Sequence, residues 1–252
     1  GKSDAGFAIS GTSAETGKTE KLYARRVILA TGGKAAPRYG TTGDGYAMAR
    51  ALGHSVTRVY PILCGMECEA DGVRLTELKG IRARGKVTLY REDTAVAEET
   101  GEIQFAGDGI SGICVFNLTP YIRAEAGETF GEALGRFTVG LDLAPDFSQD
   151  EISKRRSSFG ILTEKLAEAV SLDEIKDWRL NVTGVKGWRD AQATAGGVSL
   201  DEIDMETMES RIVPGLYFAG EIIDVHGKCG GFNLQNAWET GMKAAEFTEQ
   251  EL

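Results

Sequence analysis

The first quarter of the chain alternates short apolar runs with glycine and polar residues, a pattern typical of strands and tight turns. Residues 6–10 and 20–29 are predicted to be strands joined by a polar hairpin tip over 11–19. Residues 46–52 are predicted to form a short helix that stops at Gly53. This part of the chain therefore predicts a mixed arrangement of strands and helix.

The next stretch changes to short segments with partial alternation of apolar and polar positions. Their spacing of about ten residues, with Gly, Asp and Glu between them, predicts antiparallel strands in a small barrel or sandwich. The predicted strands cover residues 56–60, 64–69, 81–90, 94–98 and 102–105, with one more over 137–143.

Longer periodic segments in the second half predict helices. A helix over 111–126 is expected to break near Thr119 because Pro120 cannot continue it. Ser148 is expected to cap the next helix, with Glu151 completing a capping box. Beyond these, the pattern predicts helices over 148–157, 161–170 and 232–249, extended chain over 180–200, and a strand over 212–219.

Composition narrows the functional classes. The net charge of −10 over 252 residues argues against a nucleic-acid partner, since such surfaces need clustered Lys and Arg. No apolar run reaches the roughly 18 residues of a membrane span, and no signal peptide is visible, so we expect a cytoplasmic protein without a membrane partner. The four cysteines form no paired framework, and two histidines make a metal site unexpected.

Two segments imitate phosphate-binding loops. Residues 11–19 end in Gly-Lys-Thr, but five residues separate the two glycines where a Walker A loop has four, so a solvated hairpin tip is the better interpretation. Residues 107–112 match G-x-G-x-x-G literally but follow the alternating β region rather than opening a βαβ unit. We interpret them as a corner between a strand and a helix.

The candidate chemistry lies in two glycine-rich turns. Residues 27–33 form an apolar run ending in Ala-Thr-Gly-Gly, and residues 215–221 repeat the plan of a strand leading into a glycine turn. Turns of this kind lie at the ends of parallel strands, where dinucleotides bind. Gly230 and Gly231 open the last predicted helix, whose free N–H groups and dipole suit the electron-rich edge of a reduced flavin. Tight packing of helix and strand is the alternative explanation.

No residue is assigned to acid–base catalysis from the pattern alone. His226 is the candidate because it lies in the proposed cofactor loop. His54 follows a predicted helix stop and is expected to be structural.

These segments together resemble a known family. Residues 27–33 with 40–46, residues 109–112, and residues 191–198 through 220–235 are similar to the bacterial NAD(P)/FAD-dependent oxidoreductases that include aminoacetone-oxidase-like enzymes and flavoproteins tied to bile-acid dehydroxylation. The resemblance implies an α+β chain with a partial FAD domain of the glutathione-reductase type. A β-rich, barrel-like insert domain and a short helical segment interrupt that domain.

The resemblance also implies domain limits and a cofactor site. The partial FAD domain would comprise residues 1–54 and 191–252, with the insert over 55–190 and its short helical segment near 148–178. FAD is the implied cofactor, and hydride transfer through its flavin is the implied activity. The implied cofactor-binding residues are Thr31, Gly32, Gly33, Gly220, Glu221, Asp224, Gly230, Gly231, Asn233 and Leu234.

The strand and G-x-G-x-x-G turn that normally open such a domain are not found ahead of residue 27. We therefore expect a fragment that binds FAD poorly and is inactive by itself, whereas the complete enzyme would use a small-molecule substrate and NAD(P)H. An apolar strand edge left open would be covered by a homo-oligomer, a swapped segment or a rearrangement. The alternative function is a non-catalytic binding or assembly module built on the β-rich domain.

Overall fold

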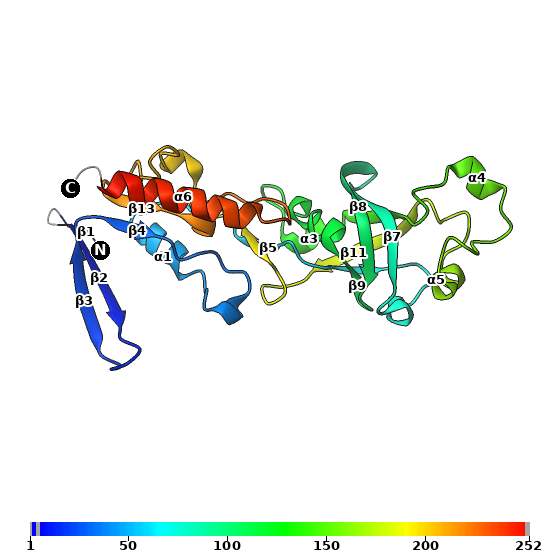
Figure 1. The fold of residues 1–252 in the computed structure, drawn as a ribbon, viewed down its shortest axis with the longest axis horizontal. Helices are drawn as coiled ribbons and strands as arrows, with labels where there is room; N and C mark the ends of the chain where they lie inside the picture. The colour runs from blue at the N-terminus through cyan, green and yellow to red at the C-terminus, as the bar shows by residue number, and fades with distance from the viewer. Residues whose placement is uncertain (1, 4–5, 250–252) are drawn as a thin grey trace. The chain divides into compact units, whose positions relative to one another are not determined.

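The computed structural model describes residues 2–3 and 6–249 and divides them between two compact units (Figure 1). The first unit comprises Gly1–Tyr60 and Ala193–Leu252, and the second comprises Pro61–Gln192. β5 (Tyr60–Ile62) and β12 (Ala193–Ala195) are the two stretches where the chain passes from one unit to the other.

A closed barrel of antiparallel strands forms the second unit, in the order β10-β11-β6-β9-β8-β7. Its strands are β6 (Met66–Glu69), β7 (Arg82–Arg91), β8 (Thr94–Phe105), β9 (Gly109–Ser111), β10 (Phe137–Asp142) and β11 (Trp178–Val185). The spacing of the alternating segments predicted a β structure of this kind. The segments predicted separately over 94–98 and 102–105 are one long strand, β8, paired along its length with β7.

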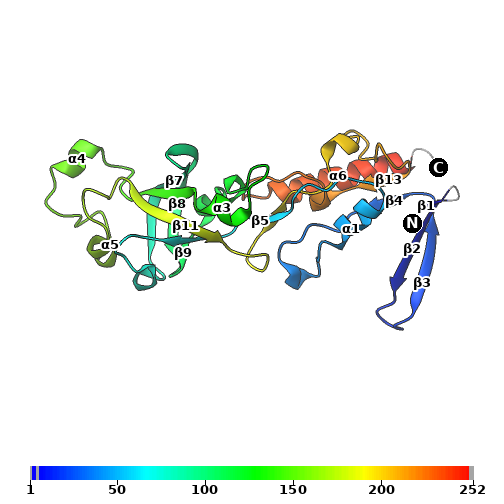
Figure 2. The same ribbon diagram turned by 180° about the vertical axis from the view of Figure 1, so that it is seen from behind.

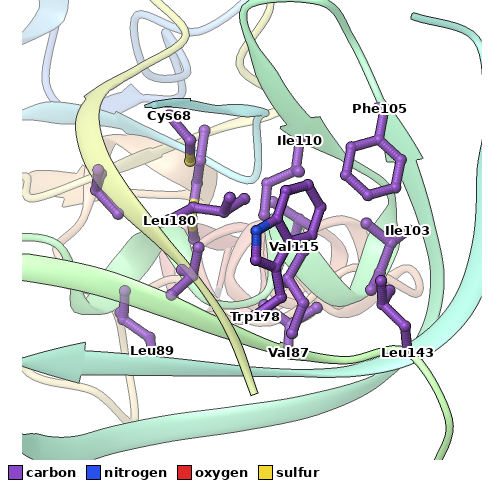
Figure 3. Close-up of a cluster of buried hydrophobic side chains, with 14 of the residues drawn as sticks. Cys68, Val87, Leu89, Ile103, Phe105, Ile110, Val115, Leu143, Trp178 and Leu180 are labelled. Atoms are coloured by element: carbon purple, nitrogen blue, oxygen red, sulfur yellow. The ribbon is translucent and has the colours of Figure 1, made fainter. Parts of the chain in front are cut away.

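Alternation along the strands fills the barrel. In β11 every second residue is buried, which turns Trp178, Leu180 and Val182 inward. The Trp178 ring lies 5.9 Å from the Phe105 ring, centroid to centroid, among aliphatic side chains from the neighbouring strands (Figure 3). The interior is therefore a packed apolar core.

The helices around the barrel are shorter than the sequence predicts. They are α2 (Ile113–Phe116), η2 (Leu75–Leu78), η3 (Thr119–Tyr121), α3 (Phe130–Leu134), α4 (Gln149–Ser153) and α5 (Glu164–Ala169). The helix predicted over 111–126 is present only as α2 and η3: Gly112 at φ +117° delays its start, the predicted break falls between Phe116 and Thr119, and the helix does not extend to residue 126. The predicted capping box of Ser148 and Glu151 is confirmed, although α4 ends at Ser153 rather than 157.

The two segments whose sequences resemble phosphate-binding loops, residues 11–19 and 107–112, are turns between strands or between a strand and a helix. Residues 13–18 connect β2 (Gly6–Thr12) to β3 (Thr19–Ala24) as a hairpin, with Gly17 N–H donating to the Ser13 carbonyl. Gly107 lies in the turn from β8 to β9, and Gly112 precedes α2. The interpretation of these segments as a hairpin tip and a strand-to-helix corner is confirmed.

A parallel strand pair forms the centre of the first unit. The helices and strands of the first unit are β1 (Lys2–Ser3), β2, β3, β4 (Val27–Leu29), η1 (Pro37–Tyr39), α1 (Asp44–Ala51), η4 (Leu200–Glu202), β13 (Leu216–Phe218), η5 (Gly220–Ile222) and α6 (Phe232–Glu249). β4 runs parallel to β13, with Ile28 opposite Tyr217. α6 packs against η5 and β13, and buried residues from α1, β13 and η5 complete the core.

Three strand predictions in this unit need correction. The strand predicted over 20–29 is divided at Arg25–Arg26 into β3, which pairs with β2, and β4, which pairs with β13. The strand predicted over 56–60 begins only at Tyr60, while Val56 forms an isolated bridge with Val198. The strand predicted over 212–219 is limited to residues 216–218 because Gly215, at φ +81°, belongs to the preceding turn.

Among the described residues, no helix combines the length and apolar character needed to cross a membrane. Within the same part of the chain, no group of three or more His, Cys, Asp and Glu side chains is arranged to hold a metal ion.

Candidate functional site

The two glycine-rich turns leave the same edge of the sheet. Because β4 and β13 are parallel neighbours, their carboxyl ends lie side by side, and the turns that follow them start together. The Ala219 N–H donates to the Leu29 carbonyl at 3.0 Å, which extends the pairing to the first turn residue. Residues 30–33 and 219–221 are thereby brought to one place.

Thr194 on β12 connects these two turns. Its hydroxyl oxygen accepts hydrogen bonds from the backbone N–H groups of Lys34 at 2.8 Å and Ala35 at 3.0 Å. Its own N–H donates to the Glu221 carboxylate. A Cβ on Gly33 would lie 2.7 Å from Glu221 Oε1 and 2.8 Å from Thr194 Cβ, so only glycine fits between these side chains. Gly33 is therefore required for the close approach of the two turns.

The carboxyl group of Glu221 has an unusual environment for an acid. Burial raises its pKa above the ordinary value, while the hydrogen bonds from Thr194 oppose the shift. The Tyr46 hydroxyl donates to the Glu221 backbone carbonyl at 3.4 Å, and the pKa of Tyr46 is raised by its own burial and then by the Glu221 charge. Glu221 therefore holds a proton to higher pH than an exposed glutamate.

Thr31 lies beneath the first turn of α1. Its Oγ1 atom is buried, and within the described part of the chain it has no hydrogen-bond partner. A side chain at Gly45 would overlap Thr31, so this glycine makes room for the hydroxyl group. An unsatisfied buried hydroxyl costs about 1–3 kcal/mol, and a partner outside the described residues would remove that cost.

Asp224 lies beyond η5 in a short polar network. Its Oδ2 atom accepts a hydrogen bond from the Thr57 hydroxyl at 2.9 Å, and the Thr57 oxygen accepts the Gly197 N–H at 2.9 Å. The Asp224 N–H donates to the Val198 carbonyl at 3.1 Å. The second Asp224 oxygen takes no part in these contacts and retains acceptor capacity toward a ligand.

The loop ahead of α6 ends in two glycines with left-handed backbone. Gly230 has φ +127° and Gly231 has φ +93°, conformations that favour glycine strongly. Nothing lies within 4 Å of the position that a Gly231 side chain would occupy, so this face of the turn is open. The Asn233 side chain holds the loop by accepting the Gly227 N–H at 2.8 Å and donating to the Gly227 carbonyl at 3.1 Å.

The two histidines differ in environment. His226 is exposed in the loop before α6. His54 is buried, with Nε2 2.9 Å from Ser210 Oγ and Nδ1 3.2 Å from Glu202 Oε2. Burial lowers the His54 pKa below its ordinary value, and Glu202 opposes that shift.

This Ser–His–Glu chain was not recognised from the sequence, and its order resembles a hydrolytic triad. The Ser210 oxygen, however, already accepts the N–H groups of Ile212 at 3.0 Å and Val213 at 2.7 Å. With both lone pairs used and the residue 6% exposed, Ser210 has no access to a substrate. The cluster is structural, as was expected for His54.

The structure thus groups the predicted site residues. Gly33, Gly220 and Glu221 meet at the strand ends, and the Gly220 N–H is bound by the Thr240 hydroxyl of α6 at 2.9 Å. Gly230, Gly231, Asn233 and the 69% exposed Leu234 form the start of α6. The roles assigned to these residues and to Gly32 stay predictions.

Sequence reasoning missed two contributors to the site, Thr194 and Tyr46. The signal for Thr194 was present in the sequence, because residues 193–197, Ala-Thr-Ala-Gly-Gly, resemble the Ala-Thr-Gly-Gly of the turn at residues 30–33. Tyr46 carried no such signal, since its contact with Glu221 joins positions 175 residues apart.

A Rossmann-like domain together with a closed antiparallel barrel is the class of fold that the parallel strand pair, its glycine turns and the barrel define. The chain belongs to the family described as HI0933-like protein Rossmann domain, which matches residues 7–247.

Among curated proteins, the chain is 33% identical over 261 residues to a 3-dehydro-bile acid delta(4,6)-reductase of Clostridium scindens, covering 89% of this chain and 62% of that protein. It is 29% identical to ribosomal RNA dihydrouridine synthases of Escherichia coli, with 97% and 64% covered, and of Haemophilus influenzae, with 88% and 59% covered. The chain thus spans about three fifths of the length of these relatives.

Proposed function

We propose that the chain provides the flavin-facing part of a FAD-dependent reductase. The observation that carries this proposal is the meeting of two glycine turns at the carboxyl ends of β4 and β13, the place where dinucleotides bind in such sheets. Membership of the HI0933-like family supports an oxidoreductase function.

The residues present fit the cofactor. Among the described residues, the buried Thr31 hydroxyl has no hydrogen-bond partner and the face of the turn at Gly231 is open, so both places can receive a ligand. Residues 31–33 would lie toward the adenosine and pyrophosphate side. Asp224 would accept hydrogen bonds from the ribityl chain, and the first N–H groups of α6 would face the flavin ring.

When bound, FAD supplies hydride transfer at the flavin. The chain's own residues bind and orient it, since the turn at residues 30–33 is fixed by Thr194 and the loop before α6 by Asn233. Burial raises the pKa of Glu221, so this carboxyl group near the strand ends keeps its proton to a higher pH than an exposed glutamate does. His226 stays the candidate for acid–base chemistry.

The names of the relatives suggest a class of reaction. A delta(4,6)-reductase acting on a 3-dehydro bile acid saturates carbon–carbon double bonds conjugated with a ketone, and a dihydrouridine synthase saturates a double bond of a uracil ring. We infer that the complete protein reduces a carbon–carbon double bond conjugated with a carbonyl group, with NAD(P)H as the source of hydride.

Flavin competition tests the proposal with the chain as it is. Titration with FAD is expected to give a saturable change in flavin fluorescence, of low affinity because the G-x-G-x-x-G match at residues 107–112 belongs to the barrel and opens no βαβ unit that would bind the phosphates. Riboflavin should compete nearly as well as FAD, whereas ADP should compete poorly. A chain that ignores both flavins would contradict the proposal and favour the non-catalytic module.

A further inference from the structure

α6 packs one face within the chain and presents a second apolar face to solvent. On the inner face, Thr240 and Ala244 are buried, and Figures 1 and 2 both show the helix beside β13, which it contacts. On the opposite face, Leu234, Trp238 and Met242 are 69%, 71% and 68% exposed. Residues four positions apart lie on the same side of a helix, so these three side chains form one apolar stripe.

A glycine in the middle of α6 leaves a notch beside this stripe. Glycine weakens the interior of a helix relative to alanine, so its presence there needs a reason. For Gly241 no described residue supplies one, because nothing lies within 4 Å of the position that its Cβ would occupy. Ala245, one turn further along the helix, is exposed and small as well. The exposed face therefore has room for the close approach of another helix.

Large and small residues alternate along this face with the spacing of a two-helix seam. Positions 234, 238, 241 and 245 are separated by four, three and four residues, which is the repeat of the seam in a coiled coil. The two seam residues in the first half of α6, Leu234 and Trp238, are large. The two in its second half, Gly241 and Ala245, are small. The face is therefore complementary to its own reversed copy.

An antiparallel second copy satisfies this order of large and small residues. Trp238 of each copy would meet Gly241 of the other, and Leu234 would meet Ala245, so that two-fold symmetry forms every contact twice. A parallel copy would place tryptophan against tryptophan and glycine against glycine, which is overpacked at one level and hollow at the next. The seam positions carry no charge, so no ion would lose its water on association.

The area of the stripe suits a weak dimer. A tryptophan side chain buries about 150–250 Å², and Leu234 and Met242 expose fractions similar to that of Trp238, so each copy would bury on the order of 450 Å². The pair would bury about 900 Å², which is the range of weak and transient complexes. A bilayer fits this helix less well, because helices on membrane surfaces are rich in Lys and Arg, whereas α6 has Lys243 alone beside several glutamates.

We propose that the exposed face of α6 is an interface between two copies of this chain, packed antiparallel with Trp238 of each copy against Gly241 of the other. The interface goes beyond the proposed reductase and does not rest on it. Each copy has a net charge of −10, so the two repel each other at long range while the apolar contact holds them together. Raising the salt concentration from about 0.05 to 0.5 M should therefore tighten the dimer.

Sedimentation velocity of the chain without flavin tests this interface. Between about 1 and 300 μM the mean mass should rise from the 27.0 kDa of one chain toward twice that value. Trp238→Ala removes the large residue and Gly241→Leu fills the notch, so each should weaken the dimer roughly tenfold or more. Gly241→Leu replaces glycine by a better helix former at an open position, so the variant should unfold at a temperature no lower than the parent chain.

A mixture of the two variants tests the antiparallel register. In a mixed pair, Trp238 of the Gly241→Leu chain meets the unchanged Gly241 of the Trp238→Ala chain. At the other crossing, the introduced leucine meets the introduced alanine, which again sets a large residue against a small one. The equimolar mixture should therefore form dimers at concentrations where neither variant associates by itself.

Two control variants separate the interface from general effects. Tyr23→Ala removes an 80% exposed ring of the β2–β3 hairpin, and Gly131→Leu fills an open position in α3; neither should change the dimer. A parent chain that stays monomeric throughout, or a dimer that both α6 substitutions leave intact, would overturn the proposal. Loss of the dimer in Tyr23→Ala would assign the contact to the hairpin instead, and a mixture that stays monomeric would refute the antiparallel register.

Discussion

The close fit of Gly33 between Thr194 and Glu221 makes Gly33→Ala a direct test of how the two turns are held together. The added methyl group would lie 2.7 Å from Glu221 Oε1 and 2.8 Å from Thr194 Cβ, closer than the 3.0 Å below which real Cβ contacts essentially do not occur. Overpacking of this kind costs about 1–3 kcal/mol.

Relief of that overlap has its own cost. Movement of Thr194 would lengthen the hydrogen bonds that its hydroxyl accepts from Lys34 at 2.8 Å and Ala35 at 3.0 Å. Each such bond contributes about 1 kcal/mol. We therefore expect Gly33→Ala to lower the free energy of unfolding of the first unit by about 2–4 kcal/mol.

Urea unfolding followed by circular dichroism measures the loss of stability, and hydrogen exchange measured by mass spectrometry locates it. Peptides containing Lys34 and Ala35 should lose protection. Gly11→Ala is the matched control because nothing lies within 4 Å of the position of its Cβ. Equal unfolding midpoints for the two variants, with unchanged exchange around residue 34, would refute the reasoning.

Three further predictions concern the buried groups. Ser210→Ala removes the acceptor of the Ile212 and Val213 N–H groups and should cost about 1–3 kcal/mol in urea unfolding; an unchanged midpoint would contradict the structural role of the cluster. Because the His54 pKa is lowered in the folded state, the unfolded chain binds more protons, so the stability contributed by His54 is complete above about pH 6.5 and decreases below it. His54→Gln should remove that part of the pH dependence. The free energy of unfolding of the parent chain and of this variant is measured from about pH 7.5 to 5, and parallel curves for the two proteins would refute the prediction. Trp178→Ala should destabilise the barrel by about 3–5 kcal/mol in thermal unfolding, and a loss below 1 kcal/mol would show that the core is not packed around this ring.

The sequence predicted the fold best where one physical signal dominated. Partial alternation predicted strands over 64–69 and 81–90, where the structure has β6 and β7, because a barrel strand has one face in the core and one in solvent. The capping box at Ser148 revealed the start of α4 because it depends on residues three positions apart. Both signals depend on residues close together in the sequence, so they can be recognised without knowledge of the fold.

Prediction failed where distant contacts decide the structure. The apolar run over 20–29 is divided at Arg25–Arg26 because its two halves pair with different partners, β2 and β13. Thr194 and Tyr46 join the site only through contacts with residues 27 and 175 positions away. The turns at Gly33 and Gly220 were predictable, but the contacts through which Thr194 and Tyr46 hold them in place were not.

Flavin competition tests the central claim most directly, because it asks whether Asp224 and the start of α6 bind the flavin half of FAD while the turn at Gly33 keeps the neighbouring Glu221 turn in place. The chain should give a saturable change in FAD fluorescence that riboflavin reverses and ADP leaves largely intact, and Gly33→Ala should weaken it relative to Gly11→Ala. No change in the fluorescence of either flavin at saturating protein, or displacement of FAD by ADP but not by riboflavin, would contradict it.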